Sequence, residues 1–245
     1  ASFAAAFDAL EHDAIDRLVV PVENSTTGSV LPVLDRLPGG NGHQPFAIVA
    51  EHLVEVQHAI LGIPGAVAEN LVEVRSHPQA LAQAERHLLD MGVDVVARPD
   101  TAGAVREVAE LSDPTVAALA PPASAEIYGL EVLLSEVMDR AHNTTRFVVL
   151  APGAPQVDPD DDKTTILFTT SHTPGALALV LAELGLRGAN LTRIESRPSN
   201  EAWSYRFFVD LIHDPGPEGL ARVIDPPPAT CADLWVLGSY ARVAE

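Results

Sequence analysis

The sequence predicts an α/β protein with two domains. Short apolar segments of strand length alternate with segments of helical periodicity over residues 1–150, a pattern typical of an α/β layer architecture with a largely parallel sheet. Residues 151–162 (APGAPQVDPDDD) offer little to a core and read as a linker. The elements of residues 163–245 follow the order βαββαβ, which is that of a small ferredoxin-like sandwich.

The first domain opens with an amphipathic helix over residues 1–16, because Phe3, Phe7 and Leu10 recur at helical spacing. Ser76, with a glutamine three residues later, has the form of a capping box, and Gly92 can end the helix that follows. The same patterns predict strands at 18–22, 71–74, 93–96, 115–120 and 145–150, and further helices at 30–37 and 101–111.

The second domain alternates in the same way. A helix is predicted over residues 174–184 with Thr173 as its N-cap, and a shorter one over residues 218–224. Strands are expected at 164–170, 191–195, 203–211 and 234–237.

The charge balance narrows the classes of partner. Thirty-four acidic residues against fifteen basic ones give a net charge of −19, which argues against nucleic acid or an anionic membrane. Such an acidic protein suits a high-salt cytoplasm; a GC-rich genome that encodes Arg in place of Lys is the alternative. The single cysteine, Cys231, excludes an intramolecular disulfide, so a reducing, cytoplasmic location is expected.

Two polar clusters lie far apart in the sequence, at residues 23–28 (ENSTTG) and 142–147 (HNTTRF). Polar residues gathered at the ends of predicted strands are typical of a ligand site. The second cluster places a hydroxyl beside a guanidinium, a combination that suits an anionic substrate in need of a proton donor.

Five motifs resemble those of one enzyme family. Residues 20–30 (VPVENSTTGSV), 76–83 (SHPQALAQ) and 143–147 (NTTRF) resemble prephenate dehydratase motifs. Residues 175–177 (GAL) and 195–198 (ESRP) resemble the paired motifs of the ACT regulatory domain that follows the catalytic domain in that family. The motifs occur in the family's order over nearly the whole chain.

The resemblance implies a catalytic domain of two lobes, similar to type II periplasmic binding proteins, with the active site in the cleft between them. The lobes are expected at roughly 1–60 with 125–150, and at 61–124. The expected reaction converts prephenate to phenylpyruvate, with loss of water and carbon dioxide, in phenylalanine biosynthesis. It requires a general acid, which typically contributes about 10²–10⁴-fold, and no metal or cofactor.

Thr145 matches the threonine to which the family assigns the acid role. Arg146 can bind a substrate carboxylate through its planar fork. The other expected substrate-binding residues are Asn24, Ser25, Gly28, Ser76, Gln79 and Phe147. Purely structural roles remain open: a capping box for Ser76 and Gln79, an ion pair for Arg146, and a core position for Phe147.

In the second domain the resemblance implies binding of the effector L-phenylalanine. The glycine at 175 lets backbone approach a ligand closely where a helix begins. The residues expected to bind the effector are Gly175, Ala176, Leu177, Glu195 and Ser196. A homodimer or homotetramer is implied, because ACT domains commonly hold their ligand at a subunit interface.

Two departures from the family pattern leave alternatives open. Family members begin with a strand and a glycine-rich turn that would precede Ala1, so we expect further N-terminal residues in the intact protein; otherwise the substrate site is incomplete. Residues 225–228 (DPPP) cut the last helix short. Arogenate dehydratase, with the same chemistry on a related substrate, and a non-catalytic amino-acid-sensing protein are the alternative functions.

Overall fold

A computed structural model describes residues 2–38, 45–139, 143–199 and 203–243. The chain divides into two compact units, Ala1–Val54 with Thr145–Glu245, and Glu55–Thr144. The chain passes from one unit to the other within β3 (Phe46–Glu55) and returns at the start of β9 (Thr144–Pro152). These two strands are neighbours in one sheet.

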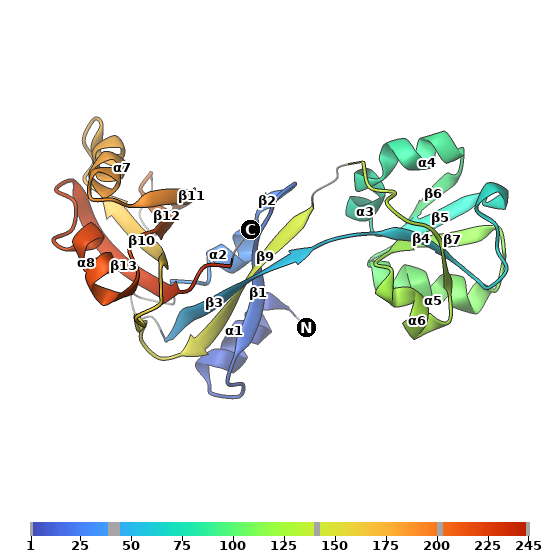
Figure 1. Cartoon of the computed structure of the whole chain (residues 1–245), viewed down its shortest axis with the longest axis horizontal. Coiled ribbons are helices and arrows are strands. Elements are labelled where there is room, and N and C mark those ends of the chain that lie inside the picture. Colours follow the sequence, from blue (N-terminus) through green and yellow to red (C-terminus); the bar gives the residue numbers. More distant parts are fainter. Residues whose placement is uncertain (1, 39–44, 140–142, 200–202, 244–245) are drawn as a thin grey trace. The chain divides into compact units, whose positions relative to one another are not determined.

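The first unit is built on an eight-stranded sheet in the order β11-β12-β10-β13-β3-β9-β1-β2 (Figure 1). Its other strands are β1 (Leu18–Asn24), β2 (Gly28–Ser29), β10 (Lys163–Thr170), β11 (Asn190–Pro198), β12 (Tyr205–Ile212) and β13 (Cys231–Tyr240). Its helices are α1 (Phe3–Glu11), α2 (Leu31–Leu34), α7 (Ala176–Leu186) and α8 (Gly216–Ile224).

The elements β10-α7-β11-β12-α8-β13 confirm the predicted βαββαβ order, and residues 163–243 are called the C-terminal domain below. Both helices lie on one side of its strands (Figure 1), where Val180 of α7 and Val223 of α8 pack with Phe168. Leu167 and Phe208 belong instead to the core that contains the N-terminal strands. The C-terminal domain therefore has a core of its own on one face and shares a core with the N-terminal strands on the other.

The C-terminal domain also joins the N-terminal strands through the backbone. β13 pairs in parallel with β3, with Gly238 opposite Ile48. A Cβ at Gly238 would lie 2.1 Å from the Ile48 carbonyl oxygen, so only glycine allows this approach.

The predicted linker makes more contacts than its composition suggested. The Asp158 backbone N–H donates to Asp161 Oδ2 (2.8 Å), and Asp161 is buried. The backbone N–H of Gly216 donates to the Asp161 carbonyl (2.8 Å). The Asp161 side chain thus closes a local turn within the segment. The Gly216 hydrogen bond fixes the segment to the domain that follows it.

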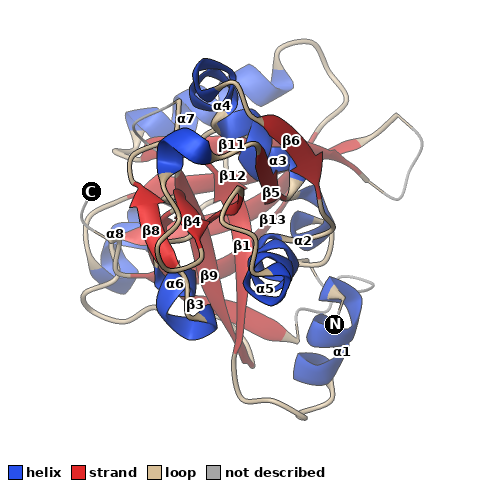
Figure 2. Cartoon of the chain, turned by 90° about the vertical axis from the view of Figure 1, so that its right-hand side faces the viewer, coloured by secondary structure: helices blue, strands red, loops and turns tan. Residues whose placement is uncertain are grey.

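The second unit has a five-stranded sheet in the order β6-β5-β7-β4-β8. Figure 2 shows α3 beside β5 and β6. Two apolar cores pack against the sheet, one on each face. Its strands are β4 (Ala59–Gly62), β5 (Glu73–Ser76), β6 (Asp94–Ala97), β7 (Val116–Ala120) and β8 (Glu131–Leu134). Its helices are η1 (Ala68–Asn70), α3 (Pro78–Gln83), α4 (Glu85–Met91), α5 (Thr101–Leu111) and α6 (Ala123–Tyr128).

The expected sheet and lobe boundaries need correction. β5 pairs in parallel with β6 and β7, but β4 pairs antiparallel with β7 and β8, so the sheet is mixed rather than largely parallel. The pairing of β8 with β4 assigns residues 125–144 to the second unit, and residues 55–60 also belong there.

The observed helix caps agree with the predicted ones only in part. Gly92 ends α4 in the left-handed conformation (φ 68°), as predicted. The N-cap of α3 is His77, whose Nδ1 accepts from the Gln79 N–H (3.2 Å), and not Ser76. The N-cap of α7 is Gly175 and not Thr173. None of the helices in the described ranges is long and apolar enough to cross a membrane.

Replacing Gly238 by Ala should destabilise the protein by about 1–3 kcal/mol, because the new methyl group collides with β3 backbone. Gly185→Ala is the matched control: it lies in α7 with open space around it and should stabilise by about 0.5–1 kcal/mol. Urea unfolding monitored by circular dichroism measures both. Equal stability of the two variants would contradict the close pairing of β13 with β3.

Candidate functional site

Antiparallel pairing of β1 with β9 brings the two polar clusters together. Asn24 lies opposite Thr145 in the register, although 121 residues separate them. The Asn24 Nδ2 donates a hydrogen bond to Thr145 Oγ1 (2.9 Å). Because directly paired residues project to the same face of a sheet, this contact follows from the strand pairing itself.

The loop after β1 fixes the orientation of the Asn24 amide. Its Oδ1 accepts from the backbone N–H groups of Thr26 (3.0 Å) and Thr27 (3.1 Å), and from the Thr26 hydroxyl (2.6 Å). Backbone N–H groups can only donate, so the oxygen must face the loop and the NH₂ group must face Thr145. Thr145 Oγ1 therefore acts as an acceptor toward Asn24 and keeps its own proton for another partner; no described residue accepts it.

Gly28 closes this hairpin. It pairs with Asn24 and has φ of +80°, a conformation that residues with a Cβ rarely adopt. The observed role of Gly28 is thus to shape the turn. Ser25 lies exposed in the same loop, and Phe147 is half-buried on β9, opposite Pro21.

Consecutive side chains of a strand project to opposite faces of the sheet, so Arg146 lies on the face opposite to Thr145. Its side chain is buried: Nε donates to Glu51 Oε2 (2.7 Å), Nη2 donates to Tyr240 Oη (2.8 Å), and Nη1 is paired with Asp210. The structure thus corrects the expectation that Arg146 and Thr145 face one ligand. The guanidinium is held by side chains of the chain itself.

Asp210 of β12 is the centre of this buried network. Thr165 Oγ1 donates to Asp210 Oδ1 (2.6 Å), so the second contact of that hydroxyl, with Tyr240 Oη (2.8 Å), uses the tyrosine proton. Burial alone would raise the pKa of Asp210, but the charges of Arg146 and Arg193 hold it below its ordinary value. Burial and the neighbouring Asp210 raise the pKa of Tyr240. The aspartate is therefore ionised and the tyrosine neutral.

Glu51 of β3 completes the network from the N-terminal side. Lys163, the first residue of β10, donates to Glu51 Oε2 (2.7 Å) and Oε1 (3.0 Å), and the backbone N–H of Val243 also donates to Oε1 (3.1 Å). Glu51 thus joins β3 to β9, the strand that carries Thr145, through Arg146, and to the C-terminal domain, through Lys163.

Ser76 and Gln79 belong to the second unit. Ser76 is fully buried at the end of β5, and its hydroxyl donates to the Leu119 carbonyl (2.6 Å). That position corrects the expectation that Ser76 contacts substrate, because the hydroxyl is committed to a neighbouring strand. Gln79 lies exposed in the first turn of α3. In the same unit the Asn143 Nδ2 donates to Gln83 Oε1 (3.1 Å).

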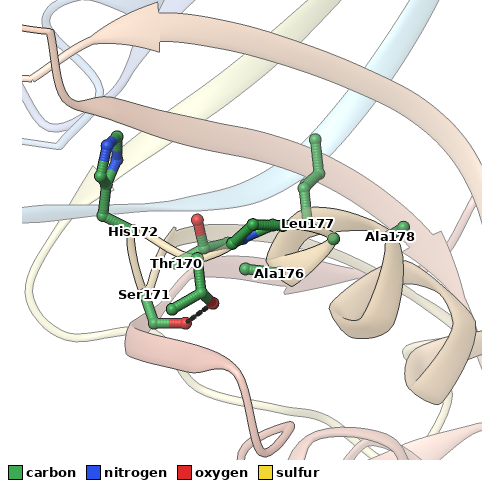
Figure 3. Close-up of a pocket in the computed structure, with 9 residues that line it drawn as sticks. Thr170, Ser171, His172, Ala176, Leu177 and Ala178 are labelled. Carbon is green, nitrogen blue, oxygen red and sulfur yellow. Dashed lines mark hydrogen bonds between the residues drawn. The ribbon is translucent and has the colours of Figure 1, made fainter.

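A hollow of about 610 Å³ lies where α7 begins, lined by residues 170–178 (Figure 3). Gly175, Ala176 and Leu177, three of the predicted effector residues, contribute to it. Gly175 has φ of +80° and allows the chain to turn from β10 into α7. The Thr230 hydroxyl donates to the Ala176 carbonyl (2.9 Å) and fixes this turn to the segment before β13.

The other two predicted effector residues lie on β11 and do not line the hollow. Glu195 Oε2 accepts a hydrogen bond from the Ser29 hydroxyl (2.6 Å) on the β1–β2 hairpin. Ser196 is opposite Phe207 of β12. Within this chain, Glu195 therefore contacts the N-terminal domain.

Glu51, Asp210 and Tyr240 were not predicted from the sequence. A signal exists for one of them: Asp210 is a single carboxylate inside the apolar run of β12, and such a group requires a buried cation. In the described part of the chain, no group of three or more His, Cys, Asp or Glu side chains is arranged to hold a metal ion.

Replacing Asp210 by Asn should lower the free energy of unfolding by about 3–5 kcal/mol at pH 7, because Arg146 would lose its buried counter-charge. The pKa of Asp210 is lowered in the folded protein, so its contribution is complete above the unfolded value of about 3.9 and is lost as pH falls through the folded value. The difference between wild type and variant should therefore narrow in acid.

Urea titrations from pH 7 to pH 3 measure this difference. Asp35→Asn is the control, because Asp35 pairs with Arg197 at the surface and should cost less than about 1 kcal/mol. A variant at Asp210 that is no less stable than the control would contradict the central place of this ion pair.

Comparison with known proteins supports the family resemblance that the motifs indicate. Residues 1–154 match the family model for prephenate dehydratase. A prephenate dehydratase of Mycolicibacterium gilvum is 35% identical, over 96% of this chain and 76% of the relative. An Arabidopsis thaliana protein named arogenate dehydratase/prephenate dehydratase 2 is 37% identical, over 97% of this chain and 64% of the relative. The chain thus spans less than two thirds of that plant relative.

Solved structures of similar fold carry two different descriptions. The Arthrobacter aurescens prephenate dehydratase in complex with L-Phe has a TM-score of 0.78 at 30% identity, over 98% of this chain and 80% of the other. A protein described as GqqA, a novel type of quorum quenching acylases, has a TM-score of 0.85 at 33% identity, over 99% and 87%. The matches of the family model and of the relatives at this identity establish that the chain belongs to the prephenate dehydratase family.

Proposed function

We propose that the protein is a cytoplasmic prephenate dehydratase, which converts prephenate to phenylpyruvate. The observation that carries this proposal is the Thr145 hydroxyl, which accepts a hydrogen bond from Asn24 Nδ2 at 2.9 Å, so that this contact does not use its proton. Prephenate is an activated cyclohexadiene that needs only one proton, delivered to its ring hydroxyl, in order to become aromatic.

In the proposed reaction Thr145 donates its proton as the ring carbon–oxygen bond breaks, and the hydroxyl leaves as water. The bond to the ring carboxylate breaks at the same stage; its electron pair enters the ring and carbon dioxide departs. Thr145 then regains a proton from solvent. A threonine is a weak acid, so its effect comes from position and from the hydrogen bond that Asn24 donates to its oxygen as negative charge develops.

The other site residues receive different support. Asn24, Ser25 and Gly28 form the loop beside Thr145, and Phe147 follows two residues later on β9, so we propose that this group orients the substrate. A substrate role for Gln79 rests on the resemblance alone. For Arg146 we propose a structural role, which is to hold the strand that carries Thr145.

Two other activities, arogenate dehydration and amide hydrolysis, should be assayed in parallel. The name of the Arabidopsis relative includes arogenate dehydratase, and the same proton donor would serve arogenate. The similarity to a described acylase suggests a hydrolytic alternative. Amide hydrolysis by a threonine needs a base to activate the hydroxyl, whereas the contact observed at Thr145 is with an amide NH₂ group, which is not a base.

We propose further that residues 163–245 form an ACT domain that binds L-phenylalanine at the hollow of residues 170–178. The L-Phe complex of a family member and the position of Gly175 at the start of α7 support this assignment. The outward side of α7 carries Leu179 and Leu186, both exposed, which suits burial against a second subunit in a homodimer or homotetramer.

Thr145→Ala should lower kcat for prephenate by about 10²–10⁴-fold, because the proton donor is lost, and Thr145→Ser should keep part of the activity. Ultraviolet detection of phenylpyruvate measures the rate, with arogenate and an acylated amine as parallel substrates. Thr169→Ala, on β10, is a matched control that should stay within about twofold of wild type. Full turnover by Thr145→Ala would refute the proposed mechanism.

Gly175→Ala should weaken L-phenylalanine binding about tenfold, because a Cβ is strained at φ +80° and the turn at the hollow must shift. Gly153→Ala introduces a comparable strain (φ +106°) in the segment before β10, away from the hollow, and should leave the Kd unchanged. Titration calorimetry measures both. Equal affinities would place the effector site elsewhere.

A further inference from the structure

Arg193 of β11 contacts both the β1–β2 hairpin and Asp210, the partner of Arg146. Its Nη2 donates to Ser29 Oγ (2.8 Å), and its Nε lies 3.4 Å from Glu23 Oε2 in an ion pair. Its Nη1 is 3.9 Å from Asp210 Oδ2. The Arg193 side chain is 7% exposed; its partner Asp210 is buried, whereas Glu23 is 38% exposed.

These contacts connect Arg193 to the two strands that carry Asn24 and Thr145. Glu23 precedes Asn24 in β1 and lies opposite Arg146, which follows Thr145 in β9. Asp210 binds the guanidinium of Arg146. Arg193 thus holds β1 directly, through Glu23, and holds β9 indirectly, through Asp210 and Arg146.

Ser29 strengthens the first of these connections. Its hydroxyl accepts a hydrogen bond from Arg193 and donates one to Glu195, so two side chains of β11 hold it. Ser29 pairs with Glu23 across the β1–β2 hairpin. The hairpin whose loop orients the Asn24 amide is therefore attached to the C-terminal domain by two charged side chains.

We propose that Arg193 is a positioning residue for the reaction: a cation of the C-terminal domain that fixes the distance between Asn24 and Thr145. The inference rests on the proposed function of Thr145. A carboxylate at Glu23 and another at Asp210 repel each other, and the Arg193 guanidinium, which contacts both, keeps the ends of β1 and β9 in register. Movement of β11 would then change the hydrogen bond at the proton donor.

Arg193→Gln should lower kcat by about tenfold to a hundredfold with KM changed less than about twofold, because a displaced donor affects the chemical step more than binding. Arg197→Gln is the matched control, since Arg197 also lies on β11 and reaches the N-terminal domain, but at Asp35 (2.7 Å). The control should stay within about twofold of wild type.

A double-mutant cycle separates positioning from general destabilisation. If Arg193 acts through Asn24, Arg193→Gln should have less than about a twofold further effect on kcat in an Asn24→Ala background. Effects that multiply in the double variant, or an equal loss in Arg197→Gln, would overturn the proposal.

Amide hydrogen exchange tests the proposal without turnover. Residues 22–29 and 144–148 should exchange faster in Arg193→Gln than in Arg197→Gln, and equal exchange would overturn the positioning role. If the wild-type protein converts neither prephenate nor arogenate, the proposed function fails, and this exchange comparison still decides whether Arg193 holds the two strands.

Discussion

The buried pair of Arg146 and Asp210 connects the N-terminal strands of the first unit to the C-terminal domain. It joins β9, which carries Thr145, to β12 of the C-terminal domain, and Glu51 and Tyr240 add β3 and β13 to the same network. Charges removed from water need such a complete set of partners. The shared apolar core and the β13–β3 pairing lie around this network, so the C-terminal domain is built into the fold of the first unit.

This arrangement separates two roles that the sequence places side by side. Thr145 and Arg146 are consecutive, yet strand geometry sends the hydroxyl toward Asn24 and the guanidinium into the core. The Thr145 hydroxyl thus lies on one face of β9 and the buried ion pair on the other. Two partners of the buried face, Asp210 and Tyr240, come from the C-terminal domain, and the third, Glu51, comes from β3.

Much of this fold could be predicted from local patterns. The helix at Thr101–Leu111 and the βαββαβ order followed from periodicity and turn residues, and the polar clusters indicated a ligand site. The pairing of β3 with β13 could not be predicted, because parallel partners far apart in sequence leave no local signal. Ser76 and Arg146 were assigned to substrate from their motifs, but their burial depends on Leu119, Asp210 and Tyr240, which lie far away in the chain.

We infer that the strands carrying Asn24 and Thr145 form one cooperative structure with the C-terminal domain. Native-state hydrogen exchange in low concentrations of urea measures the opening free energy of each strand. We expect the amides of β9 (Thr144–Pro152) and β12 (Tyr205–Ile212) to open together with one free energy. Opening of β10 to β13 at a lower free energy, while β1 and β9 stay protected, would contradict it.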